Sequence, residues 1–229
     1  MTETSQDRLL DAILPHVPFD GWSAAAFAAA CADADMTRAE AETIAPRGAI
    51  DLAIAFHRRG DRAMVEGIAT SDMAAMKFRE KVAAALRLRL DVMADQREAV
   101  RRATTLFALP QNAPDGAKLV WETSDQVWTA LGDTSRDINW YTKRATLSGV
   151  WASTVLFWLG DDTPGSADTT AFVDRRIEDV MRIEKVKAQV RDNALTKPFA
   201  NFASKVFATV KAPDFSRLDD LPSRIVRAK

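Results

Sequence analysis

Apolar residues recur at intervals of three and four along most of the chain, and this spacing limits the folds open to it. Leu9, Leu10 and Ile13 share one face of an early helix, and Val82 and Leu86 continue the pattern at mid-chain. Side chains spaced in this way lie on one face of an α-helix, which must be buried. No run of alternating residues and no hairpin signal appears. The chain is therefore predicted to be all-α, with about nine or ten helices.

Capping residues indicate where several helices begin and end. Thr37 is followed three residues later by Glu40, the spacing of a capping box, so a short helix is expected there. A helix over 49–57 is expected to stop before Gly60, because glycine is common just beyond helix ends. Ser71 is a plausible N-cap and is expected to open a long helix.

The segment 139–159 is apolar on every side rather than along one stripe. A helix of this kind lies either at the centre of a protein or at a subunit interface. A polar turn over 132–137 precedes it. A loop over 160–166 separates it from a last body helix, which is expected over 168–191.

A single cysteine and two histidines narrow the chemistry open to the chain. Cys31 lies in an Ala-rich segment, where a small buried hydrophobic residue is expected rather than a reactive thiol. His16 and His57 are too few for a zinc site, and neither has the Glu-x-x-His spacing of a di-iron bundle. The sequence contains no Gly-x-Gly pair and no Gly-x-Ser-x-Gly motif. We therefore predict no catalytic residue, no metal site and no cofactor, and a chain that is not an enzyme.

The short helices at the front, entered through Gly21-Trp22-Ser23, resemble the TetR family, in which a helix-turn-helix precedes an all-α ligand domain. A recognition helix needs basic and small polar side chains facing DNA phosphates. The corresponding segment 33–42 instead contains four acids against one arginine, Arg38. We therefore expect no nucleic-acid partner. A TetR-like regulator that senses an acyl or other apolar ligand is the alternative reading.

The C-terminal region has the pattern of a helix that lies on a membrane surface. Residues 175–229 contain 13 Lys and Arg against 7 Asp and Glu. An apolar stripe with lysines opposite it is typical of interfacial helices; packing of the stripe on the protein's own core is the less favoured alternative. The residues expected at the membrane are the apolar Leu195, Phe199, Phe202, Val206, Phe207 and Val210, with Lys197, Lys205 and Lys211.

One combination of residues resembles a known family. Leu-Pro-Gln-Asn at 109–112 is followed by Gly-Asp-x-Ser-x-Asp-x-Asn-Trp-Tyr-Thr over 132–142. This combination resembles the coenzyme Q (ubiquinone) biosynthesis accessory protein family, which has a TetR-like fold. The resemblance implies a non-enzymatic, lipid-binding homodimer that binds isoprenoid quinone intermediates at the membrane. It also implies that the protein presents them to the demethoxyubiquinone hydroxylase.

The resemblance assigns site residues as well. The partner-binding patch of the family corresponds here to Trp140, Tyr141 and Arg144, with Asp137 and Asn139 nearby. Asp137 as a helix cap and Trp140 as a core residue remain open alternatives. A polyprenyl tail needs a long apolar cavity. Its walls are expected from Leu86, Leu90, Met93, Leu119, Trp128, Trp151 and Val155.

We expect three regions: a degenerate helix-turn-helix-like region over 1–60, a ligand-binding and dimerisation body over 61–192, and an amphipathic membrane-binding helix with a tail over 193–229. The first seven residues contain two acids and no apolar run, unlike a signal or transit peptide. No segment approaches the roughly 20 apolar residues of a membrane-spanning helix. With the resemblance, this implies a bacterial cytoplasmic protein that is peripheral on the inner membrane.

Overall fold

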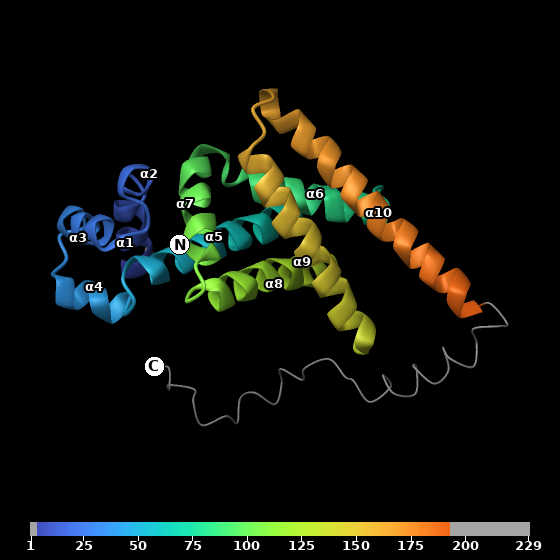
Figure 1. Ribbon diagram of the computed structural model, residues 1–229, viewed down its shortest axis with the longest axis horizontal. Helices are drawn as coiled ribbons and strands as arrows, with labels where there is room; N and C mark the ends of the chain where they lie inside the picture. Colours follow the sequence, from blue (N-terminus) through green and yellow to red (C-terminus); the bar gives the residue numbers. More distant parts are fainter. Residues whose placement is uncertain (1–3, 193–229) are drawn as a thin grey trace.

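The computed structural model describes residues 4–192 (Figure 1). Every regular element in that range is helical, so the predicted all-α fold is confirmed. The elements, in chain order, are α1 (Ser5–Ile13), α2 (Val17–Asp20), α3 (Ala24–Asp33), α4 (Arg38–Ile44), α5 (Ala49–Thr70), α6 (Phe78–Asp91), the 3₁₀ turn η1 (Ala94–Gln96), α7 (Arg97–Ala108), α8 (Ala113–Ala130), α9 (Ile138–Leu159), the 3₁₀ turn η2 (Pro164–Ser166) and α10 (Ala167–Asp192).

Helices α1 to α4 form a small cluster at one end of the molecule, shown in blue in Figure 1. The predicted capping box is confirmed: the Glu40 carboxylate accepts from Thr37 N at 2.8 Å, and the Thr37 hydroxyl accepts from Glu40 N at 3.3 Å. Residues 34–37 join α3 to α4, which is the short connection of a helix-turn-helix.

Helix α5 leaves this cluster and enters the body, where α8 packs against α5 and α9 while α10 packs against α6 and α9. Trp22 connects the front cluster to the body. Its indole Nε1 donates to the carbonyl of Ala99 on α7 at 3.1 Å, and its ring lies 5.4 Å from that of Phe56 on α5. The buried apolar residues of the two parts therefore form one continuous core.

The expected end of a helix before Gly60 is wrong, because α5 continues through Gly60 to Thr70. Gly60 is required for another reason. A Cβ at this position would lie 2.4 Å from Arg89 Nη1 and 2.8 Å from Met93 Sδ, closer than real Cβ contacts. The glycine lets α6 approach α5, and it does not end the helix.

The expected helix start at Ser71 is also wrong. Ser71 is the C-cap of α5, and its hydroxyl donates to the Gly67 carbonyl at 2.6 Å. Helix α6 begins seven residues later, where the Glu80 carboxylate accepts from Lys77 N at 2.9 Å. The expected long helix is therefore divided into α6 and α7, which are connected by η1.

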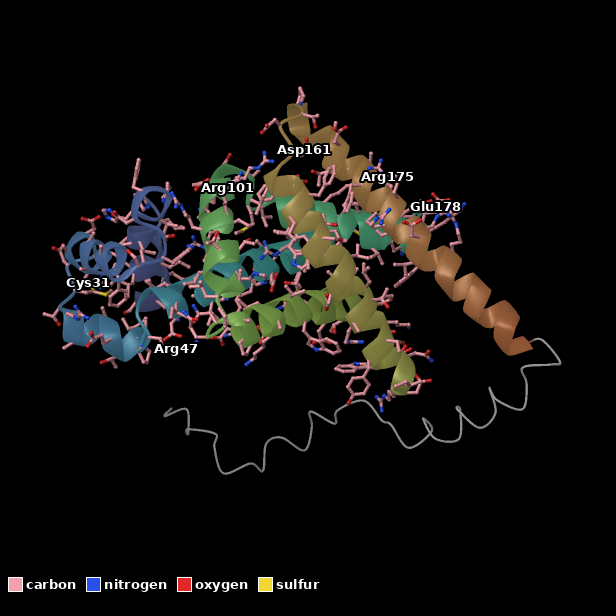
Figure 2. The ribbon with its side chains drawn as sticks, in the orientation of Figure 1. Cys31, Arg47, Arg101, Asp161, Arg175 and Glu178 are labelled. Carbon is pink, nitrogen blue, oxygen red and sulfur yellow. The ribbon has the colours of Figure 1, made fainter. Side chains whose placement is uncertain are left out.

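The turn between α9 and α10 is organised by Asp161 (Figure 2). One carboxylate oxygen accepts from Thr163 N at 2.9 Å, and the other accepts from Thr169 N and Oγ1 at 2.8 and 2.6 Å. These hydroxyl and amide donors hold the pKa of Asp161 well below its usual range. The turn directs α10 back across α9 and α6. Within the described range, no helix combines the length and the apolar character needed to cross a membrane.

Candidate functional site

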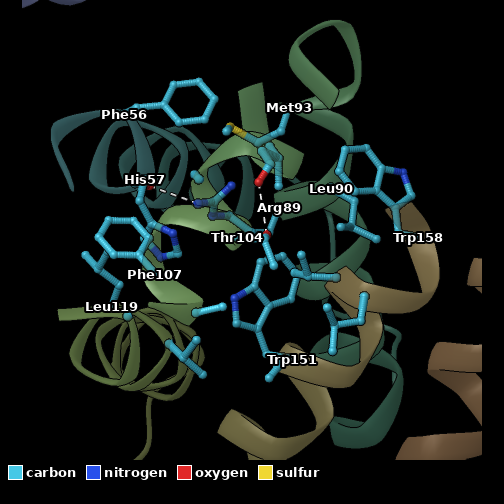
Figure 3. A pocket seen from close by; sticks show the side chains of 18 residues that line it. Phe56, His57, Arg89, Leu90, Met93, Thr104, Phe107, Leu119, Trp151 and Trp158 are labelled. Carbon is cyan, nitrogen blue, oxygen red and sulfur yellow. Dashed lines mark hydrogen bonds between the residues drawn. The ribbon is translucent and has the colours of Figure 1, made fainter. Parts of the chain in front are cut away.

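A mainly apolar cavity of about 340 Å³ lies among α5, α6, α7, α8 and α9 (Figure 3). This volume is within the range of small-molecule pockets, roughly 300–1,000 Å³. The lining side chains are Phe56, His57, Arg89, Leu90, Met93, Val100, Ala103, Thr104, Phe107, Ala108, Leu119, Val120, Trp151, Ala152, Val155, Leu156 and Trp158, and Gly116 contributes backbone.

The cavity gathers many of the residues expected at a lipid site. Leu90, Met93, Leu119, Trp151 and Val155 all line it. Two others lie elsewhere: Leu86 is fully buried outside this lining, and Trp128 lines a second cavity of about 230 Å³ beside Phe78, Val82 and Lys143. Five of the seven residues expected at the lipid site therefore line one cavity.

The wall contributed by α7 was missed. Val100, Ala103, Thr104 and Phe107 recur at intervals of three and four on this helix and face the cavity. That spacing is a signal which could have revealed them. The expected single helix after Ser71 obscured it, because α7 runs in a new direction after η1.

A buried polar network borders the cavity between α5, α6 and α8. Arg89 Nε donates to Asp61 Oδ1 at 2.6 Å, and Arg89 Nη2 donates to the His57 carbonyl at 2.9 Å. The Thr123 hydroxyl lies 3.0 Å from Asp61 Oδ1 and 2.8 Å from His57 Nε2. The exposed fraction of the residue is 2% for Arg89 and 0% for Asp61 and Thr123. Arg89 and Asp61 thus form a buried charge pair, and the Thr123 hydroxyl and the His57 carbonyl provide its neutral hydrogen-bond partners.

His57 is neutral at pH 7 in this setting. Burial, with a smaller effect of the positive charge on Arg89, lowers the pKa of His57 from 6.5 to about 4. The negative charges on Asp61 and Glu122 act in the opposite direction but do not overcome burial.

The five residues of the expected partner patch lie in or beside the first two turns of α9, with different exposure. Asp137 is exposed and caps the helix, since its Oδ1 accepts from Asn139 N at 3.0 Å. Asn139 is exposed, and Tyr141 is half-buried. Trp140 and Arg144 are buried, and the Arg144 guanidinium lies 4.1 Å from the centre of the Trp140 ring. The exposed part of this surface is therefore formed by Asp137, Asn139 and Tyr141.

Arg144 is anchored by acidic residues from α8 and the following turn. Its Nη1 lies 3.1 Å from Asp133 Oδ2, and its Nε lies 2.5 Å from Asp125 Oδ1. Lys143 Nζ lies 2.8 Å from Asp133 Oδ1. Burial would raise the pKa of Asp133, but hydrogen bonds from Lys143, Ser135 and Arg144 lower it to about 2. This cluster fixes the turn over 132–137 against α9.

Cys31 is buried in α3, as expected, and burial raises the pKa of its thiol (Figure 2). Within residues 4–192, no group of three or more His, Cys, Asp or Glu side chains is placed to hold a metal ion. The expected membrane-surface residues from Leu195 to Lys211 lie outside the described residues.

Comparison with known proteins identifies the same family that the sequence resembles. A family model described as COQ9 matches residues 113–184, which contain α8, α9 and most of α10. A protein of Xenopus tropicalis named "Ubiquinone biosynthesis protein COQ9, mitochondrial" is 31% identical over 82% of this chain and 61% of its own length. The Homo sapiens protein of the same name is 30% identical over 82% of this chain and 61% of its own length.

A Drosophila melanogaster protein of this name is 26% identical over 89% of this chain and 63% of its own length. The chain therefore spans less than two thirds of the length of these relatives. Among solved structures, a TetR transcriptional regulator from Nitrosomonas europaea matches with a TM-score of 0.62 and 19% identity, covering 76% of this chain and 95% of the regulator. This similarity shows the fold.

The expected bacterial cytoplasmic location is wrong. The curated relatives from frog, human, slime mould and fly are eukaryotic proteins, and each is named mitochondrial. The expectation rested on the composition of the first seven residues. In a chain that spans 61% of a relative's length, those residues do not report on a targeting segment.

The family model over residues 113–184 covers the α8 and α9 walls of the cavity and the turn before α9. The chain is thus homologous to the COQ9 ubiquinone biosynthesis proteins and has a TetR-like fold, as its sequence resemblance implied.

Proposed function

We propose that the chain acts in ubiquinone biosynthesis as a non-enzymatic, lipid-binding accessory protein that holds isoprenoid quinone intermediates. The observation that carries this proposal is the apolar cavity of about 340 Å³ in a chain whose relatives are named ubiquinone biosynthesis proteins. Trp151, Phe107 and Val155 provide the apolar contact that an isoprenoid chain requires, and burial of such groups stabilises binding by about 25 cal/mol per Å².

The partner in this proposal is the demethoxyubiquinone hydroxylase. The surface formed by Asp137, Asn139 and Tyr141 supports it, because an aromatic side chain flanked by polar groups is typical of interface hot spots. Trp140 and Arg144 lie beneath this surface and would hold Tyr141 in position, since the Trp140 and Tyr141 rings meet edge to face at 4.8 Å.

Two further parts of the proposal concern assembly. We infer a homodimer that uses the exposed apolar side of α9, where Leu156 and Phe157 are 61% and 37% exposed. Large exposed apolar side chains of this kind favour a protein interface. The membrane contact is assigned to Leu195, Phe199, Phe202, Val206, Phe207 and Val210 with Lys197, Lys205 and Lys211, on sequence grounds alone.

DNA is not a partner in this proposal. Asp33, Asp35, Glu40 and Glu42 are all exposed on α3, α4 and the turn between them. Arg38 lies beside them, but its Nε pairs with Glu42 at 2.7 Å. A phosphate backbone would be repelled by this surface. The regulator alternative therefore lacks the basic face that it requires.

Organic extraction of the purified protein, followed by mass spectrometry, tests the proposal. We expect a long-chain quinone intermediate in the extract. Ala152→Phe, which fills the cavity from α9, should reduce the extracted lipid, whereas Ala145→Phe at an exposed position of the same helix should not. An extract that contains no isoprenoid from the unmodified protein would contradict the proposal.

A further inference from the structure

The polar side chains that line the cavity come mainly from its α5 and α6 walls. Among the lining residues of the described chain, Arg89 is the one that carries a formal charge, and His57 lies next to it (Figure 3). Apart from Thr104, the other lining side chains are apolar or aromatic, and Trp151 and Phe107 are among them. The cavity is therefore amphiphilic, with one polar region in an otherwise apolar space.

Arg89 still has a donor available. Its Nε bonds to Asp61 and its Nη2 to the His57 carbonyl, and no hydrogen bond formed by residues 4–192 uses Nη1. Asp61 Oδ2 is also buried without a hydrogen-bond partner in this part of the chain, 3.5 Å from His57 Nε2. Asp61 does not line the cavity, and its free oxygen needs a donor. Arg89 does line the cavity, so its Nη1 is the atom that can donate to an acceptor group of a ligand.

The charges around this region decide which polar group fits. Asp61 neutralises Arg89 at 2.6 Å, and the half-buried His57, with its pKa lowered to about 4, carries no charge at pH 7. A buried anion would therefore meet no net positive charge to offset the loss of its hydration. A neutral acceptor, such as a carbonyl oxygen, carries a much smaller desolvation cost and can still accept from the guanidinium.

The neighbouring rings favour a flat head group. The Arg89 guanidinium lies 5.6 Å from the centre of the Trp151 ring, and Phe56 and Phe107 line the same cavity. Guanidinium and aromatic faces both stack on flat rings.

We propose that Arg89 is a head-group anchor, which binds a neutral ring carbonyl of an amphiphile and rejects anionic heads such as carboxylates and phosphates. This inference rests on the proposed function, because it specifies which head group the same cavity binds and how that head group is oriented. The ring lies against Trp151 with its carbonyl toward Arg89, and the tail follows the apolar walls of α7 and α9.

Competition against N-phenyl-1-naphthylamine, an uncharged fluorescent probe, tests the anchor. Three competitors share a decyl chain on a six-membered ring: decyl-1,4-benzoquinone, decylbenzene and 4-decylbenzoate. We expect the quinone to bind more tightly than the benzoate. The infrared carbonyl band of the bound quinone should shift to lower frequency than in an alkane solvent, because the carbonyl accepts a hydrogen bond.

The double substitution Asp61→Asn with Arg89→Gln removes the charge pair as a unit, so no uncompensated buried charge remains. We expect the preference for quinone over decylbenzene to fall about tenfold, the size expected for one hydrogen bond to a charged group. Val155→Ala, on the apolar wall, should weaken both competitors to the same extent and leave their ratio unchanged.

The outcomes separate the anchor from the carrier function. If none of the competitors displaces the naphthylamine, the carrier proposal fails. If the quinone and decylbenzene displace it but the quinone carbonyl band is unshifted, or the benzoate binds as tightly as the quinone, the cavity binds lipids and the anchor is wrong. The infrared and benzoate measurements need only the unmodified protein, so they decide the question even where the double variant does not fold.

Discussion

Gly60 on α5 and Arg89 on α6 occupy adjoining space, such that a single added carbon at residue 60 would lie 2.4 Å from Arg89 Nη1. The contact also keeps the guanidinium 2.6 Å from Asp61 Oδ1, one residue further along α5. Because both charged side chains are buried, the position of Arg89 depends on the absence of a side chain at Gly60.

Gly60→Ala is expected to lower the free energy of unfolding by about 3 kcal/mol or more, since it displaces Arg89 and leaves Asp61 buried without its partner. Gly67→Ala, on the same helix, is the matched control. Its Cβ would lie 3.6 Å from Leu88, an ordinary contact, so a gain of about 0.5–1 kcal/mol from helix propensity is expected. Urea unfolding of both variants checks this, and equal effects at the two glycines would contradict it.

His57 should make the protein less stable as the pH falls from about 6.5 to 4. Its pKa is lowered from 6.5 to about 4 in the folded state, so in this interval the unfolded chain binds more protons than the folded chain. The resulting loss in the free energy of unfolding is on the order of 3 kcal/mol at the low end of the interval.

Urea unfolding between pH 7 and 4.5 measures this dependence. His57→Gln retains a side-chain donor toward Thr123 but cannot take up a proton, so the dependence on pH should become shallower. His16→Gln, which leaves His57 in place, should retain it. An unchanged slope in His57→Gln would show that other groups cause the loss.

Two substitutions in and after the turn before α9 are expected to have different effects: one lowers the stability of the fold, and the other weakens partner binding. Asp133→Asn removes an acid whose pKa is lowered to about 2 by Lys143, Ser135 and Arg144, and should cost roughly 2 kcal/mol of stability. Tyr141→Ala, at the half-buried surface position, should cost about 1 kcal/mol or less but weaken capture of the demethoxyubiquinone hydroxylase. Full capture by Tyr141→Ala would remove the docking surface from the proposal.

Deletion of residues 195–229 should abolish co-sedimentation with liposomes that contain anionic lipid, because the lysines and the apolar stripe expected at the membrane lie in this segment. The thermal transition of the shortened chain should stay close to that of the full chain. Full co-sedimentation after the deletion, or loss of the cooperative transition, would contradict the assignment of this segment to the membrane surface.

Local signals in the sequence predicted local structure well. The Thr37–Glu40 capping box depends on residues three apart, and it forms as expected. Leu90, Trp151 and Val155 were predicted at the cavity because their spacing placed them on buried helix faces. The polar residues over 132–137 predicted the turn before α9, but neither they nor the resemblance over 132–142 showed that Arg144 is buried there.

Features that depend on distant partners were predicted wrongly or missed. A glycine in the sequence looks the same whether it ends a helix or makes room for a side chain from another helix. At Gly60, only the position of Arg89 in the folded protein distinguishes these two roles. Ser71 is equally suited to open a helix or to bond back to Gly67. The Arg89–Asp61 pair joins residues 28 positions apart, and no pattern in the sequence signals that distance.

Helix α5 runs without interruption from Ala49 to Thr70, about 33 Å at 1.5 Å per residue. It carries Ala49 and Leu52 in the core near the front cluster and Phe56 and His57 at the cavity wall. Because α5 is continuous, a change in the orientation of the front cluster would also move Phe56 and His57 at the cavity wall.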